Sequence, residues 1–361
     1  MADPVVLAAR DGPLRADYEA IGVEVRLFAA PLPEAGAFDE GLDRLKRLIE
    51  GLSGEVVIAN TLHMFFAVNA AAQARIASIW CQHESEPWQT YFDFLAPEVR
   101  SHAYAAFGQA YRVTYVANAT RRAWAGVQTR HSAQTIRHGV PAARLAEETG
   151  RWTRSAAREA LGVRNGELVI SLVGTVCRRK GQMDLIKALS GLASESPRPL
   201  RAFIAGAQPE RDYLGQLRKA VTEMPEDAAA RISITGPVED MSVYYAAADI
   251  VACTSRIESA PRVLIEAMAF ERAIVTTPVF GIPELVDPGV NALFYPAGDI
   301  DVLKREILRL ATDDALREAM ASTGHDVLAS RPGYIDMIDA YAALVREAAM
   351  LRATAASTRS V

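Results

Sequence analysis

Short apolar runs alternate with longer stretches of helical length along the whole chain. The runs are four to six residues long and rich in Val, Ile, Leu and Ala, as strands of a buried parallel sheet are. They cover residues 5–8, 23–28, 56–59, 76–80, 113–116, 168–173, 201–205, 231–234, 249–253 and 273–276. The intervening stretches carry Ala, Leu, Arg and Glu. This alternation predicts an α/β fold made of doubly wound, Rossmann-like domains.

The length of the chain points to two domains, because 361 residues exceed what a single hydrophobic core usually holds. Turn residues and charges replace strand-like runs at about residues 139–153. We therefore expect a first domain at residues 1–143 and a second at residues 144–332.

Composition and charge narrow the class of protein. Half of the residues are apolar, 23% are charged and the formal net charge is −5 without a long basic run, which gives nucleic-acid binding no support. The most apolar region, residues 56–80, is interrupted by polar side chains, so no transmembrane segment is predicted. No signal peptide is evident, and three cysteines without paired spacing fit buried thiols. We expect a cytoplasmic protein.

The most informative segment is residues 258–266, which begins and ends with a glutamate. We expect Glu258 on the loop after a strand and Glu266 one turn into the next helix, with Ser259 as the N-cap and Pro261 in the first turn. In open α/β sheets ligands bind at this edge, and a helix start favours phosphate. Two interpretations stay open: the carboxylates bind sugar and ribose hydroxyls, or Glu266 only pairs with Arg262 at i,i+4.

A second candidate segment follows the strand at residues 168–173. Gly174 permits close backbone approach, and Arg178, Arg179 and Lys180 place three cations before a helix that starts near Gln182. A diphosphate is bound by such cations, whereas a solvated basic turn is the alternative. The spacing is not that of a P-loop.

Two further signals concern histidines and metals. His63 and His83 each follow a strand of the first half, so a ligand role is open for both, and more so for His83. The pair Asp299 and Asp301 resembles a D-x-D metal motif, but Asp299 opens a helix and suits an N-cap. No metal site is predicted.

Several segments together resemble a known family. They are G-T-V-C-R-R-K-G-Q (174–182), G-P-V-E-D (236–240), A-A-A-D-I (246–250), E-S-A-P-R-V-L-I-E-A-M-A (258–269) and G-I-P-E-L-V (281–286). In this order they are similar to the nucleotide-sugar half of the retaining GT-B glycosyltransferases that carry the E-x7-E motif, glycosyltransferase family 4. The resemblance covers about residues 113–343. It implies two Rossmann-like domains that face a crevice, with a last helix at residues 333–350 that returns to the first domain.

The resemblance implies roles for individual residues. Glu258, His83 and Lys180 are expected near the transferred sugar and the leaving diphosphate. The expected donor-binding residues are Thr175, Arg178, Arg179, Lys180, Val238, Arg262, Val263, Leu264 and Glu266. The family usually has Arg where Thr175 stands, so Arg178 or Arg179 is expected to supply that charge. Pro261 replaces a common Gly.

The resemblance also has a gap at the start of the chain. The first strand and glycine-rich loop of the family are not evident, and residues 11–14 resemble a segment that follows them. We therefore expect a truncated, acceptor-side first domain. A partner chain that supplies the missing elements, and contact with the inner face of a membrane, stay open.

These observations predict a metal-independent, retaining glycosyltransferase. It would move a sugar from a nucleoside-diphosphate sugar, without a cofactor, to a glycan, glycolipid or small-molecule acceptor. The expected context is polysaccharide or envelope glycan synthesis. The alternatives are a sugar-nucleotide 2-epimerase with the same fold and a non-catalytic protein that binds a donor or a partner.

Overall fold

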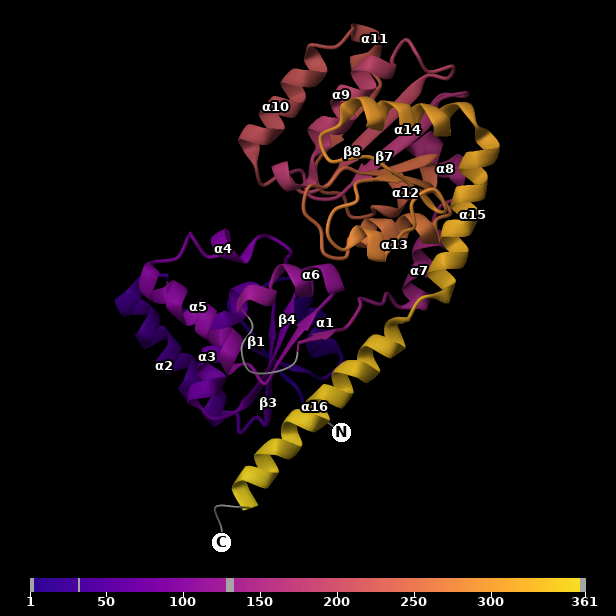
Figure 1. The fold of residues 1–361 in the computed structure, drawn as a ribbon. Coiled ribbons are helices and arrows are strands. Elements are labelled where there is room, and N and C mark those ends of the chain that lie inside the picture. Colours follow the sequence, from indigo (N-terminus) through magenta and orange to yellow (C-terminus); the bar gives the residue numbers. More distant parts are fainter. Residues whose placement is uncertain (1–2, 32, 128–132, 358–361) are drawn as a thin grey trace. The chain divides into compact units, whose positions relative to one another are not determined.

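The computed structural model describes residues 3–31, 33–127 and 133–357, which form two compact units (Figure 1). Unit 1 comprises the chain up to residue 116, residues 121–136 and the segment from Asp339 onward. Unit 2 comprises Ala117–Thr120 and Arg137–Ile338. This division passes between Ile136 and Arg137, before the boundary at residues 143 and 144 that the sequence suggests. The domain limits inferred from the sequence stay predictions.

Unit 2 is built on a six-stranded parallel sheet in the order β12-β11-β10-β7-β8-β9. The strands are β7 (Leu168–Val173), β8 (Leu200–Ala205), β9 (Ile232–Thr235), β10 (Ile250–Cys253), β11 (Ala273–Thr276) and β12 (Ala292–Phe294). The order reverses beside β7, because β8 and β9 lie on one side of it and β10 to β12 on the other. In an open parallel sheet this reversal creates a ligand-binding position at the carboxyl ends of the strands.

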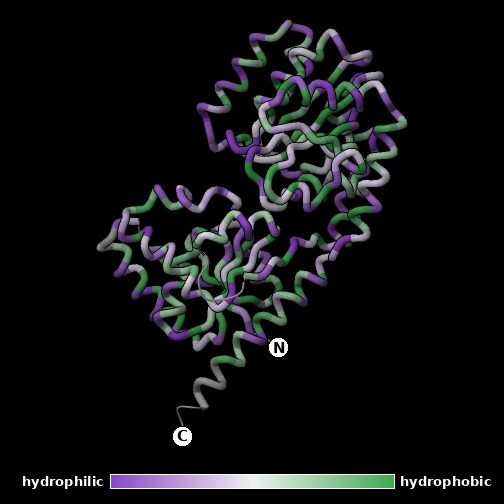
Figure 2. The backbone as a smooth tube through the Cα atoms, in the orientation of Figure 1, coloured by the Kyte–Doolittle hydropathy of each residue, from purple (hydrophilic) through white to green (hydrophobic). Residues whose placement is uncertain are grey.

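Helices cover both faces of this sheet, and successive side chains of β7 pack alternately against the helices of one face and of the other. Leu168, Ile170 and Leu172 belong to a core with helices α9 and α14, whereas Val169 belongs to a second core with α12 and α13. Successive side chains of a strand point to opposite faces, so a strand covered on both faces carries apolar side chains on both of them. Figure 2 shows hydrophobic residues along the sheet strands and hydrophilic ones on the outer helices.

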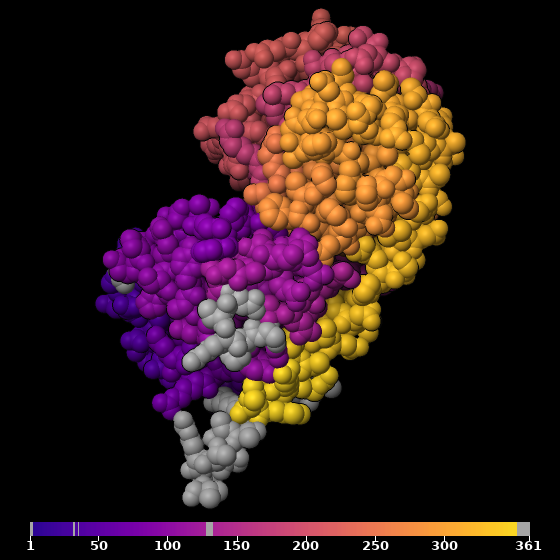
Figure 3. Space-filling model, viewed as in Figure 1, coloured from indigo at the N-terminus to yellow at the C-terminus, as the bar shows by residue number. Residues whose placement is uncertain are grey.

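The helices of unit 2 vary in length. They are α7 (Ala142–Gly150), α8 (Arg154–Ala160), α9 (Gln182–Leu192), α10 (Arg211–Thr222), α11 (Glu226–Ala229), α12 (Ser242–Ala247), α13 (Arg262–Ala269), α14 (Ile300–Thr312) and α15 (Asp314–Ser330), with 3-10 turns η3 (Arg178–Lys180) and η4 (Ile282–Glu284). In the space-filling view the later residues of unit 2, coloured orange and yellow, form a continuous part of its surface (Figure 3).

Unit 1 contains two separate parallel sheets rather than one. β1 (Val5–Ala8) pairs with β2 (Glu24–Leu27), and the second sheet has the order β3-β4-β5-β6. Its strands are β3 (Val56–Asn60), β4 (Ala77–Gln82), β5 (Arg112–Tyr115) and β6 (Gln134–Thr135). Among the described residues no strand joins β1 to β3. An interruption of this kind is compatible with the truncated first domain expected from the sequence, which stays a prediction.

The core of unit 1 is rich in aromatic rings. Trp124 stacks on Phe107, and Phe92 meets Trp124 edge-on. The helical elements in the first 136 residues are α1 (Leu14–Ala20), α2 (Ala35–Gly51), η1 (Leu62–Met64), α3 (Phe65–Gln73), α4 (Trp88–Tyr91), α5 (Pro97–Gln109), α6 (Asn118–Ala123) and η2 (Ala125–Val127). The last helix, α16 (Tyr334–Ser357), contacts β5 of unit 1, where Arg112 donates to Glu347 at 2.9 Å. No helix in the described part of the chain is long and apolar enough to span a membrane.

The ten strands expected from the hydrophobic pattern are all present, with ends that shift by one or two residues. The pattern missed β6 and β12, which have two and three residues. The expected N-cap at Asp299 is confirmed, because its side chain accepts a hydrogen bond from the Val302 amide at 3.0 Å. The three cysteines are free and buried, as predicted.

Candidate functional site

Lys180 and Glu258 meet at the carboxyl edge of the unit 2 sheet. Lys180 ends the loop that follows β7, and Glu258 lies on the loop that follows the neighbouring strand β10. The Lys180 ammonium donates to Glu258 Oε1, and the Ser255 hydroxyl donates to the same oxygen at 2.9 Å. Glu258 is buried and the Lys180 side chain is 17% exposed, so the pair is largely shielded from water. Shielding strengthens its interaction with any neighbouring charge.

Gly181 fixes the position of Lys180. Its φ is +64°, a left-handed value that favours glycine, and a Cβ there would overlap the carbonyl oxygen of Thr254. The Thr254 hydroxyl in turn donates to the Lys180 carbonyl at 2.8 Å. The loop after β7 is thereby joined to the strand end of β10, which requires a residue without a side chain at position 181.

The structure separates the two arginines that precede Lys180. Arg179 donates to the Ile257 carbonyl at 2.9 Å and lies 3.6 Å from Glu258 Oε1. Arg178 lies toward α10, where it donates to Gln216 at 3.2 Å and covers the Tyr213 ring. Only Arg179 therefore joins the group around Lys180 and Glu258.

Arg256 is a further cation at this edge that the sequence analysis missed. Its guanidinium donates to the buried carboxylate of Asp184 at 2.7 Å, and its backbone amide donates to the Arg179 carbonyl at 2.8 Å. Asp184 also accepts from the Gly298 amide at 3.0 Å. The available signal was its position two residues before Glu258, on the same loop.

Helix α13 begins at Arg262 with Pro261 as its N-cap. The expectation that Ser259 is the N-cap is wrong: the chain is still extended at Pro261, so the helix starts later, and no side chain caps this end. The Leu264 amide bonds to the Pro261 carbonyl at 3.2 Å. The side chains of Val263 and Leu264 are buried in the core, so only backbone groups of these two residues can face a ligand.

Glu266 is held by two donors from different sides. The Tyr245 hydroxyl donates to Oε2 at 2.6 Å and the Arg262 guanidinium donates to Oε1 at 3.0 Å. The i,i+4 pair with Arg262 that the sequence left open is thus present. The contact with Tyr245 was not foreseen, because 21 residues separate the two.

Thr175 follows the end of β7, on the same loop as Lys180, and Val238 follows the end of β9. The Thr175 carbonyl accepts from the side chain of Gln182 at 2.9 Å, which ties the loop after β7 to the start of α9. Val238 follows β9 and is partly buried against the second core. Both residues lie at the carboxyl edge of the sheet, although β9 is one of its two edge strands.

His83 belongs to unit 1 and follows β4. Its Nε2 lies 2.7 Å from Asn60 Oδ1, at the end of the neighbouring strand β3. The next residue, Glu84, accepts backbone hydrogen bonds from His83 and Leu62 at 3.0 and 3.2 Å. Burial raises the pKa of the Glu84 carboxyl above its usual range. His63 lies nearby, 3.2 Å from the Tyr91 hydroxyl.

The described residues contain no group of His, Cys, Asp or Glu side chains suited to a metal ion. The edge of the unit 2 sheet instead offers cations, carboxylates and a helix start. Such a combination suits a ligand that has both anionic phosphates and hydroxyl groups.

Known proteins share this sequence pattern and fold. Residues 167–313 match the family model described as glycosyl transferases group 1. D-inositol 3-phosphate glycosyltransferase of Saccharomonospora viridis is 32% identical over 210 residues, which are 56% of this chain and 48% of that protein. The crystal structure of HepE from Anabaena in complex with UDP matches with a TM-score of 0.78 and 22% identity, over 95% of this chain and 92% of that one.

Residues 167–313 are thus similar to the group 1 glycosyltransferases, and the chain has the GT-B fold. A GDP-mannose-dependent mannosyltransferase of Corynebacterium glutamicum is another relative, 28% identical over 59% of this chain and 56% of that protein. The chain spans about half the length of the first curated relatives that it matches. The relatives named here are transferases, and none is described as an epimerase.

Proposed function

We propose that this protein is a retaining group 1 glycosyltransferase that uses a nucleoside-diphosphate sugar as donor and needs no metal ion. The observation that carries the proposal is the group formed by Lys180, Arg179 and Glu258 at the carboxyl edge of the sheet. It lies within the segment that matches the family model. HepE, which shares the fold, binds UDP, and relatives of this chain transfer sugars.

In the proposed site the cations bind the diphosphate. Lys180 and Arg179 would stabilise the negative charge that grows on the leaving group, which is the main contribution expected to the rate. Backbone amides at the start of α13, at Arg262 and Val263, would add donors and a positive helix end. These groups would supply the positive charge that a divalent metal ion supplies in other diphosphate sites. The proposed reaction therefore needs no metal ion.

The two glutamates would bind the two ends of the donor. Glu258 would contact the sugar, where positive charge develops in an oxocarbenium-like transition state, and Glu266 would accept hydrogen bonds from the ribose. No protein nucleophile is proposed, and transfer would occur on the face of the sugar that the diphosphate leaves. Val238 and Thr175 would line the site through their strand-end positions, and His83 would contribute from unit 1.

The acceptor is proposed to be a glycan, a glycolipid or a small molecule bound on the side of unit 1. A cytoplasmic location, with contact to a membrane surface or to a partner chain, belongs to the same proposal. The sheet of unit 1 is interrupted between β1 and β3, and this interruption is where a partner strand would be added.

The proposal is tested by incubating the purified chain with UDP-, GDP- and ADP-sugars and a panel of glycan, glycolipid and small-molecule acceptors. Released nucleotide is measured, with EDTA in parallel samples. We expect one donor class to be cleaved, at the same rate with and without EDTA, and a product with the donor's anomeric configuration by NMR. A change of the donor sugar's own configuration would instead support the epimerase alternative. Binding without turnover, in the presence of varied acceptors, would support the non-catalytic alternative.

A further inference from the structure

Tyr245 occupies an unusual place beside Glu266. It lies on α12, 2% exposed, with its ring stacked on Phe270 at a centroid distance of 5.4 Å. Its hydroxyl nevertheless donates to Glu266 Oε2 at 2.6 Å. A hydrogen-bond partner stabilises a buried phenol, and here that partner is one oxygen of a candidate ribose-binding carboxylate.

The two oxygens of Glu266 have different surroundings. Oε2 accepts from the buried phenol, whereas Oε1 accepts from Arg262, whose side chain is 46% exposed. Bonds to exposed arginines are weak and exchange readily with other partners. Oε1 is therefore the oxygen that a ligand hydroxyl can reach, and Oε2 is the oxygen that sets the plane of the carboxylate.

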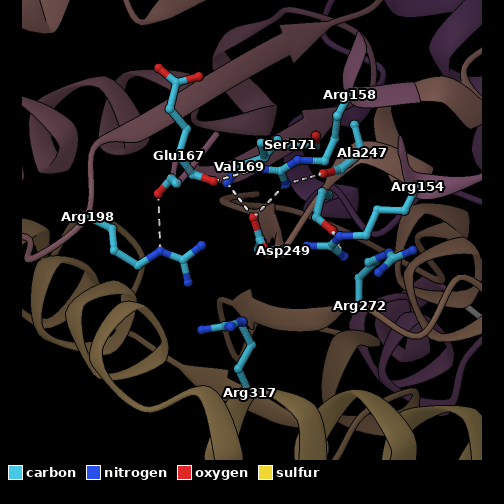
Figure 4. A network of polar contacts seen from close by, with 12 residues as sticks. Arg154, Arg158, Glu167, Val169, Ser171, Arg198, Ala247, Asp249, Arg272 and Arg317 are labelled. Carbon is cyan, nitrogen blue, oxygen red and sulfur yellow. Dashed lines mark hydrogen bonds and ion pairs between the residues drawn. The ribbon is translucent and has the colours of Figure 1, made fainter. Parts of the chain in front are cut away.

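The backbone that carries Tyr245 is itself fixed by three arginines at the end of α12. Arg272 donates to the Tyr245 carbonyl at 3.0 Å, Arg158 to the Ala247 carbonyl at 3.2 Å, and Arg154 to the Ala248 carbonyl at 3.1 Å. Arg154 and Arg158 also bind the buried carboxylate of Asp249 (Figure 4). Cations at a helix C-terminus satisfy its free carbonyls and interact favourably with its dipole.

We propose that Tyr245 is a positioning residue for donor recognition: its hydroxyl orients Glu266 so that Oε1 accepts a hydrogen bond from the ribose of the nucleotide. The inference rests on the proposed function, which assigns the ribose to Glu266. Burial raises the pKa of Tyr245 well above its ordinary value, so the hydroxyl keeps its proton and remains a donor throughout the working pH range. Without this donor the carboxylate is free to turn both oxygens toward Arg262.

The test uses Tyr245→Phe in the full chain, with Tyr244→Phe as the matched control. Tyr244 is the neighbouring buried tyrosine of α12, and the structure gives no hydrogen bond from its hydroxyl to Glu266. Calorimetric titration compares whichever of UDP, GDP and ADP binds the unmodified chain most tightly with the 2′,3′-dideoxy form of the same nucleotide. Both variants are also checked for an unchanged melting temperature.

We expect Tyr245→Phe to weaken binding of the ribonucleotide by roughly three- to tenfold, the effect of one lost hydrogen bond, and to leave binding of the dideoxy form unchanged. Tyr244→Phe should change neither. In a Glu266→Gln background, Tyr245→Phe should cause no additional loss, because the two residues act through one contact. An equal loss for both nucleotides, or an additional loss in that background, would overturn the inference.

The Glu266→Gln variant separates this inference from the function on which it rests. If Glu266→Gln weakens ribonucleotide binding and Tyr245→Phe does not, the positioning role is wrong and the ribose assignment stands. If Glu266→Gln itself leaves the preference for ribonucleotide over dideoxynucleotide intact, the ribose assignment is wrong, and the inference falls with it.

Discussion

The ammonium of Lys180 pairs with the buried carboxylate of Glu258, across the carboxyl ends of the adjacent strands β7 and β10. Without a ligand, each charge neutralises the other. A bound diphosphate would add two or more negative charges next to this pair. The two residues are therefore expected to affect donor binding in opposite directions, since Lys180 attracts the phosphates and Glu258 repels them.

Glu258→Gln should slow sugar transfer without weakening nucleotide binding. The glutamine amide is uncharged, so no negative charge remains beside Lys180. The variant should therefore bind the nucleoside diphosphate as tightly as the unmodified chain, or more tightly. The rate should fall, because the carboxylate stabilises charge that develops only in the transition state. Single-turnover rates and dissociation constants, measured beside Glu266→Gln, check this. Lower nucleotide affinity with an intact rate would show that the roles of the two glutamates are assigned wrongly.

Arg179→Ala and Arg178→Ala should differ. Arg179 lies 3.6 Å from Glu258, whereas Arg178 bonds to Gln216 of α10. We expect Arg179→Ala to weaken nucleoside-diphosphate binding by about tenfold, the loss of one charge-assisted contact, and Arg178→Ala to have little effect. Titration calorimetry provides the comparison. If the two variants lose the same affinity, the different orientations of the two side chains do not determine which arginine binds the phosphate.

Gly181→Ala should destabilise the chain more than Gly162→Ala. Both glycines have φ +64°, so an L side chain is strained at each, by about 1–2 kcal/mol. A Cβ at Gly162 meets open space, but at Gly181 it overlaps the Thr254 carbonyl. Urea unfolding should therefore give the larger loss for Gly181→Ala, together with weaker nucleotide binding through the displaced Lys180. Similar losses of unfolding free energy at the two positions would contradict the close approach of the loop after β7 to the end of β10.

Glu84→Gln should stabilise the chain more at neutral than at acidic pH. Burial raises the pKa of Glu84 in the folded state. The ionised carboxylate therefore lowers the free energy of unfolding once the pH exceeds the pKa of Glu84 in the unfolded chain. This cost is absent below the unfolded pKa and grows as the pH rises through the folded pKa. The variant has no such cost. Urea midpoints at pH 4.5 and 7.5 check the sign: a variant that gains nothing relative to the unmodified chain between these pH values would contradict it.

The sequence predicted the features that depend on local pattern. Each strand of four or more residues has an apolar run of its own, and Asp299 caps a helix that starts within reach of its side chain. β6 and β12 are too short to have a pattern and are defined by their neighbours in the sheet. The late start of α13 at Arg262 also escaped, because Ser259 and Pro261 both suit a helix start.

The contacts of the site were less predictable because they join distant residues. Sequence order brings Arg178 and Arg179 together, but only the turn of η3 decides that they diverge. Tyr245 and Glu266 lie on different helices, and their hydrogen bond depends on how α12 and α13 pack on one face of the sheet. The local sequence identified Lys180 and Glu258 as candidates, whereas their pairing depends on the adjacent positions of β7 and β10 in the sheet.

Nucleoside-diphosphate affinity of Lys180→Ala, compared with the same nucleoside monophosphate, tests the central claim most directly. Lys187→Ala, a change of an exposed lysine on α9, is the control, and the melting temperature of each variant is recorded. The account predicts that Lys180→Ala weakens diphosphate binding by at least about tenfold, from a charge-assisted contact of about 1.5–3 kcal/mol, and affects the monophosphate less, while Lys187→Ala changes neither. An unchanged diphosphate dissociation constant in a folded Lys180→Ala chain would contradict it.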